Sequence, residues 1–417
     1  MRIEEIVARG SGPAQTPGLA RELAALGPRA IPALLEVLAL RPRPRDPTPR
    51  SSSKSDARAK LHDTPPADPI AESLLAALVE MPGIKLRSAL EDSIARDSSA
   101  RARCAVLRCL GRAGTARDLA LVARAACTVA PDEPMADEVR SALVRALLEV
   151  LARDPSACGA IEGVYPHVAP VVRPGFLEAL GLRAGDAALR SLSRLLHIDA
   201  DLRARALVEI GRAAAKSSRP VDDDVLANVR RYLVEGVPAG LPEAILAVGY
   251  LDDCESIPQL IALLSSEHRG ARANAQWSLQ RITRLGFRDT PDQWAAWYAS
   301  EMEWWTRVWP SLAEDLHGRD RTRLRVALAQ LGSRNLDRHR LAVEVAATLQ
   351  VEDLTTQDLA CAVLGQLGSS AAVPALIAAL EHDDAAIRTS AWSALRKITG
   401  LDLPLDAVRW RESRSTG

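Results

Sequence analysis

The stretch that decides the fold is residues 363–401, which read VLGQLGSSAAVPALIAALEHDDAAIRTSAWSALRKITGL. Its first part predicts a helix over residues 371–380, because apolar side chains recur there at the i, i+3, i+4, i+7 spacing of one buried helical face. Pro374 falls in the first turn of this helix, where a missing N–H group costs nothing. The second part predicts another helix that follows the aspartates 383–384, either of which could cap it, and that ends near Gly400.

A second copy of this stretch lies 116 residues upstream, at residues 247–285, without an insertion or a deletion. The copies share glycine, proline, apolar and arginine positions, which pair as Gly249 with Gly365, Pro258 with Pro374, Leu260 with Leu376, Arg272 with Arg388, Leu279 with Leu395 and Ile282 with Ile398. The register continues past the helices, since Trp294 pairs with Trp410. A unit of two short helices cannot bury its apolar face alone, so neighbouring units must stack.

An arginine followed seven residues later by an apolar residue marks the second helix of further units. These arginines are Arg103, Arg140, Arg173 and Arg203, spaced 37, 33 and 30 residues apart. That spacing is typical of stacked helical repeats. Alanine and leucine are abundant and aromatic residues are scarce, which favours helix throughout. The sequence therefore predicts an all-α fold, a right-handed α-solenoid of helix pairs.

The repeated unit resembles HEAT repeats, and more narrowly the bacterial HEAT-like repeats related to phycobilin lyases. The resemblance is carried by the LGxxxAVPALIxxL run at residues 367–380, the IRxxAxxAL run at residues 387–395, and the IT-x-L tail followed by Trp410. It implies the solenoid fold and a protein that binds other macromolecules. In this family the repeat arginine typically pairs with an acidic residue of the preceding turn. The acidic partners would be Asp384 for Arg388, Asp199 or Asp201 for Arg203, and Glu267 for Arg272.

The pattern divides the chain into segments of different character. They are an N-terminal helix pair (1–40), a basic loop rich in proline and serine (41–69), HEAT-like repeats (70–286), a Trp-rich helical segment (287–316), C-terminal HEAT-like repeats (317–401) and a tail (402–417). The loop carries seven basic residues between Arg41 and Lys60 and two acidic ones, and its few apolar side chains predict disorder. It is either a solvated insertion between repeats or a tail attracted to nucleic acid or an acidic partner.

Six aromatic residues lie within one span of 16 residues, at Trp294, Trp297, Tyr298, Trp304, Trp305 and Trp309. Asp289, Thr290 or Asp292 could cap a helix that carries them. One interpretation is a long helix that packs over the end of the preceding repeat and bridges irregular stacking. The other is a surface for a partner, because tryptophan, tyrosine and arginine dominate binding energy at interfaces. The candidate partner-binding residues are Trp294, Trp297, Trp304, Trp305, Arg307 and Trp309.

The charges balance, with 53 basic and 53 acidic residues. A protein whose whole surface binds nucleic acid would carry a basic excess, so the balance disfavours that class. The alternative function is a HEAT-like protein associated with nucleic acid, by DNA binding or as a glycosylase-like enzyme, through the basic loop and arginines on the concave face. A bilin lyase, the other enzyme class among such folds, would need a tetrapyrrole pocket that the sequence does not show.

The sequence carries no Walker-type phosphate loop, no GxGxxG, no GxSxG and no HExxH run. The seven histidines are scattered singly, and the six cysteines lack CxxC spacing, as expected of buried thiols in a reducing compartment. The three aspartates at 222–224 do not face one point on a helix, so N-capping explains them better than a metal does. We therefore expect no catalytic residues, no metal site and no cofactor.

The N-terminus lacks the apolar core of a signal peptide, and no run approaches the roughly 20 apolar residues of a membrane span. We expect a cytoplasmic protein with no membrane segment, a monomer by default. Its predicted function is that of a non-enzymatic scaffold that offers a concave surface of second helices to a protein partner.

Overall fold

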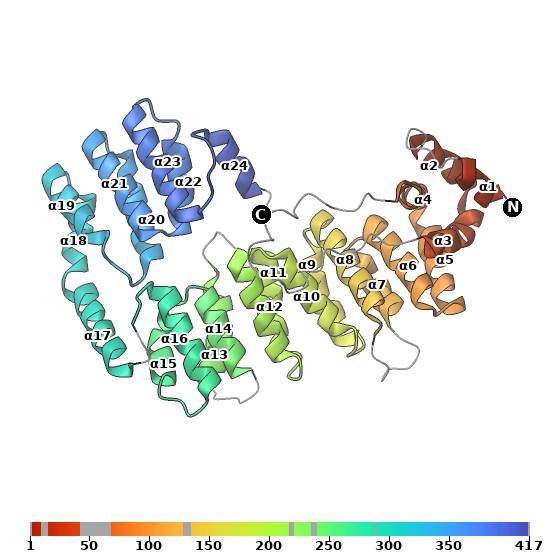
Figure 1. The fold of residues 1–417 in the computed structure, drawn as a ribbon, viewed down its shortest axis with the longest axis horizontal. Coiled ribbons are helices and arrows are strands. Elements are labelled where there is room, and N and C mark those ends of the chain that lie inside the picture. Colours follow the sequence, from red (N-terminus) through yellow and green to blue (C-terminus); the bar gives the residue numbers. More distant parts are fainter. Residues whose placement is uncertain are drawn as a thin grey trace. The chain divides into compact units, whose positions relative to one another are not determined.

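The computed structural model describes residues 2–9, 16–41, 68–127, 135–216, 221–234, 240–287 and 290–415, and every regular element in these ranges is a helix (Figure 1). The all-α prediction is therefore confirmed. The chain divides into two compact units, residues 1–183 and 184–417. The predicted loop, residues 41–69, falls outside the described ranges except at its two ends.

The N-terminal unit is a stack of helix pairs. Its elements are α1 (Arg2–Arg9), α2 (Thr16–Ala24), η1 (Pro28–Ala30), α3 (Ile31–Leu40), α4 (Pro69–Val79), α5 (Gly83–Arg96), α6 (Ala100–Ala113), η2 (Ala116–Asp118), α7 (Leu119–Ala126), α8 (Asp137–Arg153), α9 (Ala157–Val164), η3 (Tyr165–His167) and α10 (Arg173–Arg183). Helices α4, α6, α8 and α10 pack side by side as one row, and the second row pairs α3 with α5 and α7 with α9. Leucine, alanine and valine side chains dominate the buried core.

The C-terminal unit holds two stacks with one long helix between them. Its elements are α11 (Asp186–Leu195), α12 (Arg203–Lys216), α13 (Asp223–Val234), α14 (Leu241–Tyr250), η4 (Cys254–Ser256), α15 (Ile257–Leu263), α16 (Arg269–Thr283), α17 (Pro291–Arg307), α18 (Trp309–His317), α19 (Arg321–Leu331), α20 (Arg338–Ala347), η5 (Thr348–Gln350), α21 (Leu354–Leu367), η6 (Ser370–Ala372), α22 (Val373–Ala379), α23 (Ala385–Thr399) and α24 (Ala407–Ser415). In the first stack, α11–α16, the long helices α12, α14 and α16 form one row. In the second stack, α18–α24, the corresponding row is α19, α21 and α23.

The two copies found at an offset of 116 residues have the same order of elements. The upstream copy runs α14, η4, α15, α16, α17 and the downstream copy α21, η6, α22, α23, α24. Each copy ends in a helix that packs on its own short helix, α17 on α15 and α24 on α22. The paired tryptophans of these last helices, Trp294 and Trp410, are 0% and 1% exposed. The sequence repeat is therefore a structural repeat that closes with a tryptophan-anchored helix.

Glycine at the paired positions 249 and 365 lets two long helices approach closely. A Cβ atom on Gly249 would lie 2.5 Å from Oγ of Ser278 on α16, and one on Gly365 would lie 3.2 Å from Cα of Ala394 on α23. A side chain at either position would push the neighbouring helix away. The recurring glycine is thus a packing requirement of the repeat.

At the start of α23, Asp384 and Arg388 bind backbone groups, whereas the resemblance implied that they bind each other. One carboxylate oxygen of Asp384 accepts hydrogen bonds from the backbone N–H groups of Ala386 (2.7 Å) and Ile387 (3.4 Å), so this residue is the N-cap of α23. Arg388 donates instead to the two backbone carbonyls of residues 382–383, at 2.8 and 2.7 Å. The expected ion pair between the two side chains is therefore wrong.

Two arginines of the first stack also bind backbone carbonyls instead of the carboxylates that the resemblance implied. Arg272 donates to the backbone carbonyls of Ser266 (2.6 Å) and Glu267 (3.0 Å), not to the Glu267 carboxylate. Arg203 donates to the backbone carbonyl of Leu196 (3.5 Å). Each arginine therefore satisfies backbone carbonyls in the turn that connects two helices of a repeat.

Within the described ranges, no single helix combines the length and the apolar composition that crossing a membrane requires. Residues 18–24 and 28–40 meet these requirements only as a pair, and that pair is bent by 97°.

Candidate functional site

The Trp-rich segment forms two helices, α17 and α18, instead of the one long helix predicted. Thr290, one of the three predicted caps, is the N-cap residue of α17, whereas Asp289 lies outside the described ranges. The helix breaks at Val308 because Pro310 occupies the first turn of α18 and has no N–H group to continue the hydrogen bonding of α17. The aromatic side chains fall into two groups, one near each end of α17, and Trp309 of α18 belongs to the second group.

The first group closes the first stack. Trp294 is fully buried and packs edge-on against Phe287, with 4.9 Å between the ring centroids, and against Trp297, at 5.9 Å. Since α17 also packs on α15, its N-terminal half belongs to the core of the upstream copy.

The second group belongs to the core of the second stack. Trp304, Trp305 and Trp309 lie 5.1–6.3 Å apart between ring centroids and pack with the apolar side chains of α18–α24. Arg334 lies over the ring of Trp304, at 4.9 Å from its centroid, and Arg340 lies 5.1 Å from the centroid of Trp305. Helix α17 therefore bridges the two stacks, with one aromatic group in each core.

The structure brings the six candidate partner-binding residues into no common patch. Trp294 and Trp309 are interior side chains, 0% and 7% exposed, with no surface to offer a partner. The half-buried members are Trp297, Trp304 and Trp305. Arg307 is exposed and forms an ion pair with Glu303 at 2.5 Å. Packing thus accounts for most of the aromatic surface of this segment.

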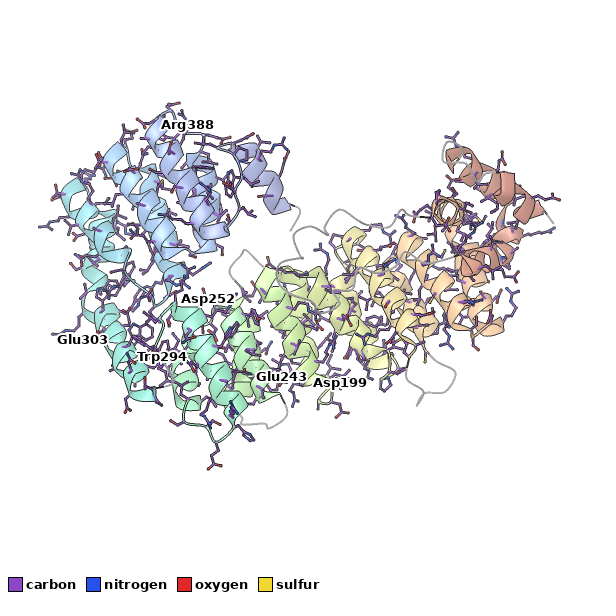
Figure 2. All side chains as sticks on the ribbon, in the orientation of Figure 1. Asp199, Glu243, Asp252, Trp294, Glu303 and Arg388 are labelled. Carbon is purple, nitrogen blue, oxygen red and sulfur yellow. The ribbon has the colours of Figure 1, made fainter. Side chains whose placement is uncertain are left out.

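A different feature of the C-terminal unit is a groove of about 520 Å³ where helix ends of the two stacks meet. Its walls come from the ends of α12, α14, α16 and α21 and from the segments that begin α13, α20 and η6. Figure 2 labels one of its residues, Asp252 after α14, together with Trp294 on α17. Charged side chains of both signs line the groove, namely Arg230, Arg281, Arg284, Arg338, Asp223, Asp252, Asp253, Glu255 and Asp337.

Two arginines join the stacks at this groove. Arg284, which follows α16, donates to the backbone carbonyls of Leu367 (3.3 Å) and Gly368 (2.8 Å) at the end of α21. Arg338, at the start of α20 and 6% exposed, donates to the backbone carbonyls of Leu367 and Ile282, each at 3.0 Å. Arg284 therefore binds the C-terminal end of α21, and Arg338 binds the C-terminal ends of both α16 and α21. We refer to Arg284, Arg338 and the adjoining Asp252 as the arginine joint.

Backbone strain is concentrated at the groove. Four residues of the described ranges have positive φ without being glycine, and three of them line the groove: Asp252 (58°), Arg284 (59°) and Asp337 (49°). The left-handed conformation costs such residues roughly 1–2 kcal/mol each. Residues in this conformation are held there by their surroundings and are typical of functional or switching sites.

Two of these positions, 252 and 284, are occupied by glycine in the downstream copy. Asp252 pairs with Gly368 and Arg284 pairs with Gly400, and both glycines have positive φ, 60° and 71°. The upstream copy thus places charged side chains where the downstream copy has glycine. Arg284 is the C-cap residue of α16, as Gly400 is of α23, so the left-handed conformation ends the helix in both copies and the upstream copy adds side-chain contacts to it. An alignment of the two copies shows a charged residue opposite a glycine at both positions. That difference is the sequence feature from which they could have been predicted.

Desolvation shapes the electrostatics of the arginine joint. Burial raises the pKa of Asp252, against the lowering effect of Arg338 at 3.5 Å, although half of the Asp252 side chain still faces the groove. Burial, followed by repulsion from Arg338, lowers the pKa of Arg284. Burial also lowers the pKa of His339, whose Nδ1 lies 2.9 Å from Oγ of Ser369. The joint is therefore a partly desolvated charge cluster next to an uncharged imidazole.

One wall of the groove carries a cluster of two aromatic rings and an arginine. Tyr250 packs on Trp277 with 4.8 Å between ring centroids, and the Arg281 guanidinium lies 4.9 Å from the centroid of Tyr250. Nε of Arg281 donates to the backbone carbonyl of Gly249 (3.1 Å), which fixes its position. Tyr250 is only half-buried and Arg281 is exposed, and both line the groove. These residue types are the ones that dominate binding energy at protein interfaces.

The opposite charges on the groove are largely paired with one another. Arg230 donates to both carboxylate oxygens of Asp253, each at 2.7 Å, and forms a further ion pair with Glu255. The hydrogen bond to Asp253 raises the pKa of Arg230 further. Glu255 remains 76% exposed, so a negative charge is accessible on this rim.

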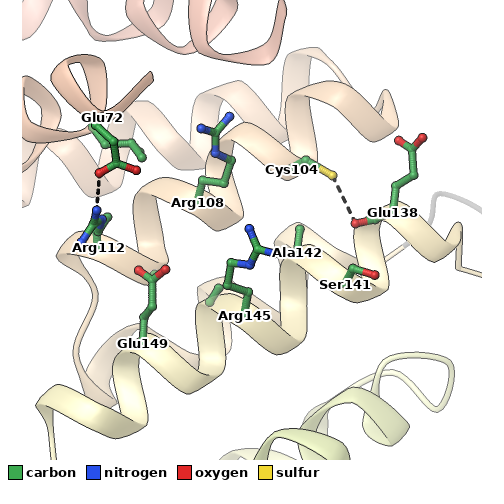
Figure 3. Close-up of a pocket in the computed structure, with 12 residues that line it drawn as sticks. Glu72, Cys104, Arg108, Arg112, Glu138, Ser141, Ala142, Arg145 and Glu149 are labelled. Atoms are coloured by element: carbon green, nitrogen blue, oxygen red, sulfur yellow. Dashed lines mark hydrogen bonds and ion pairs between the residues drawn. The ribbon is translucent and has the colours of Figure 1, made fainter. Parts of the chain in front are cut away.

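The N-terminal unit has a smaller groove, of about 100 Å³, along α4, α6 and α8 (Figure 3). Arg112 of α6 pairs with Glu72 of α4, and Glu149 of α8 lies beside them. Burial raises the pKa of Glu149, while Arg112 and then Arg153 lower it. Three arginines and three glutamates line this groove, so its charges balance.

The described residues offer few side chains suited to nucleophilic catalysis or to metal binding. These ranges contain no group of three or more histidine, cysteine, aspartate or glutamate side chains arranged to hold a metal ion. Burial raises the pKa of Cys254, the thiol that lines the larger groove, to about 12, and that of Cys109 and Cys361 to the same value. Protonated thiols are poor nucleophiles.

Comparison with known proteins gives one family match. Residues 344–409 match a family model described as HEAT repeats. No curated protein matches the sequence significantly.

Solved structures similar to the chain include an engineered protein of the Northeast Structural Genomics Consortium, with 16% identity, a TM-score of 0.29, and coverage of 95% of this chain and 98% of that one. Kap121p bound to Pho4p has 13% identity and a TM-score of 0.27, with coverage of 95% and 49%. Importin beta has 12% identity and a TM-score of 0.32, with coverage of 99% and 56%. The chain spans about half the length of these last two proteins.

The family match covers most of the second stack, and the downstream copy within it repeats the upstream copy element for element. The match supports the interpretation of the chain as a HEAT-repeat protein.

Proposed function

We propose that the protein is a non-enzymatic scaffold that binds another protein in the larger groove of its C-terminal unit. The observation that carries this proposal is the accessible pair Tyr250 and Arg281 on a groove wall. Their positions are set in advance by the contact with Trp277 and by the hydrogen bond to Gly249. A wall that is already ordered loses little conformational entropy when a partner binds.

The charges of the groove favour a polypeptide over a nucleic acid as the occupant. Four arginines and five carboxylates line it. A phosphate backbone would meet these carboxylates, and two of the arginines, Arg284 and Arg338, already donate to backbone carbonyls. A peptide segment with side chains of both signs matches such a surface, and the volume of about 520 Å³ suits a short segment.

A narrower identity for the repeats rests on sequence alone. The motif at residues 367–380 supports HEAT-like repeats of the bacterial type related to phycobilin lyases. A cytoplasmic location is supported by six free cysteines, of which four are buried.

Site-specific photocrosslinking tests the proposal. A photoreactive amino acid replaces Ser370, which lines the groove, and in a matched control it replaces Ser300, an exposed residue of α17 outside the groove. Each purified protein is irradiated in an extract of its native cells, with and without nuclease. We expect a protein adduct at position 370 that is absent at position 300 and insensitive to nuclease.

The captured protein is then purified and its binding measured directly. The proposal requires that it bind the wild-type chain and compete with crosslinking at position 370. Equal yields of adduct at positions 370 and 300 would show that the partner is not bound specifically in the groove. An adduct that nuclease abolishes, with binding that falls steeply as salt rises, would replace it with the nucleic-acid function.

A further inference from the structure

The two stacks of the C-terminal unit have separate apolar cores. The core of the second stack runs from Trp309 to Trp410 and takes in Trp304 and Trp305 from the end of α17. Trp294, ten residues before Trp304, packs instead with Phe287 in the first stack. Helix α17 thus carries apolar side chains into both cores and connects the two stacks.

The arginine joint is a second connection, and it is polar. Arg284 reaches from the first stack to the carbonyls of Leu367 and Gly368 in the second. Arg338 reaches from the second stack to Ile282 and Asp252 in the first. Hydrogen bonds of this kind exchange with water at small net cost, whereas an apolar core does not. The joint can therefore open while each stack stays folded.

The backbone at the joint shows that these contacts are retained at a cost. Arg284 has positive φ at a position where the paired residue of the downstream copy is Gly400. On the other side of the contact, a Cβ atom on Gly368 would overlap the Arg284 guanidinium. A strained arginine thus meets a glycine that leaves room for it, which is the complementarity expected of a built contact.

We propose that Arg284, Arg338 and Asp252 form a latch that holds the two stacks together, and that its release lets them rotate about α17. This inference holds with or without a partner. If the groove is the docking site proposed above, release of the latch also changes its width, because the latch residues line it. That last consequence rests on the proposed function, and the latch itself does not.

Distance measurement between the stacks tests the latch. Spin labels on genetically encoded amino acids are placed at Ala273 of α16 and Ala362 of α21, both exposed. The label-to-label distance distribution is recorded by pulsed electron paramagnetic resonance for the wild type and for Arg284→Gly. We expect one narrow distribution for the wild type and a broader one for Arg284→Gly. Circular dichroism confirms that each variant is folded.

Two further variants make the result specific. Gly368→Ala keeps the arginine but displaces its guanidinium, and it should also broaden the distribution. Arg307→Ala removes an exposed arginine of α17 that contacts neither stack's latch residues, and it should leave the distribution unchanged. An unchanged distribution in Arg284→Gly, or an equally broad one in the wild type, would overturn the latch. Neither result bears on whether a partner is captured at position 370, so the two proposals fail separately.

Discussion

Asp384 and Arg388 lie one turn apart at the start of α23, yet each is bound to the backbone rather than to the other. The carboxylate accepts N–H groups of its own helix, and the guanidinium donates to carbonyls of the turn between α22 and α23. Opposite charges at this spacing suggest an ion pair in a sequence, but unpaired backbone groups at helix ends compete for the same side chains. The identity of the residues was predictable here, and their partners were not.

Substitution of Asp384 separates an N-cap from an ion pair. The variant Asp384→Asn keeps a capping oxygen without the charge, so we expect it to change the free energy of unfolding by less than about 0.5 kcal/mol. Asp384→Ala removes the cap and should lower that free energy by about 1 kcal/mol. Denaturant unfolding measures both, with Asp383→Ala as the control, since its side chain accepts no helix N–H group. If Asp384→Asn lowered the free energy of unfolding as much as Asp384→Ala, the charge of Asp384 would matter and the ion-pair interpretation would stand.

A double-mutant cycle measures the contact between Arg284 and Gly368. In the wild-type background Gly368→Ala introduces a strained residue and a clash, and it should lower the free energy of unfolding of the C-terminal unit by about 1–3 kcal/mol. In the Arg284→Gly background the clash is absent and only the strain remains. We expect a coupling energy of at least about 0.5 kcal/mol. Additive effects would show that the two residues do not meet.

At the scale of elements, α17 determines how the C-terminal unit is built. Its tryptophans were visible in the sequence as a cluster, which left packing, the favoured interpretation, and partner binding both open. The structure divides the cluster between two cores within α17, between Trp297 and Trp304, and Pro310 ends that helix one turn later. That proline was also visible in the sequence. The distribution of rings between two stacks was not predictable, because it depends on which helices the two ends of α17 meet.

Truncation of the buried tryptophan tests the anchoring of α17. Trp294 is fully buried, so we expect Trp294→Ala to lower the free energy of unfolding by about 3–5 kcal/mol. Trp297 lies on the same helix and is only half-buried, so Trp297→Ala should cost clearly less. Thermal and denaturant unfolding compare the two variants. Similar losses in both would contradict the assignment of Trp294 to the core.

The carboxyl group of Glu301 on α17 makes the stability of the folded protein depend on pH. Burial raises the pKa of this carboxyl above its ordinary value of 4.5, against the lowering effect of Arg334. The folded state then binds the proton more tightly than the unfolded state, so stability is greatest below the unfolded pKa and decreases as the pH rises through the folded value. We expect Glu301→Gln to remove this decrease, measured by urea unfolding from pH 4 upward. The exposed neighbour variant Glu303→Gln should keep it, and identical pH profiles for all three proteins would refute the assignment.

At the scale of the whole molecule, the repeat was predictable and the groove was not. The spacing of apolar residues in 363–401 follows from helix geometry, which is local, so helices and their stacking could be inferred. The groove forms where ends of α16, α20 and α21 converge, and that convergence depends on the path of α17 between the stacks. Tyr250 and Arg281 are ordinary helix residues in the sequence and acquire their accessible position only there.

The affinity of the protein captured at position 370 for three forms of the chain tests the central claim most directly. Ser370→Arg fills the groove with a bulky charged side chain, and Ala329→Arg places the same side chain on an exposed position of α19 outside it. Calorimetric titration gives the Kd for each form. We predict that Ser370→Arg weakens binding at least about tenfold, which corresponds to about 1.4 kcal/mol, and that Ala329→Arg leaves it unchanged. The same Kd for all three forms would show that the partner binds elsewhere.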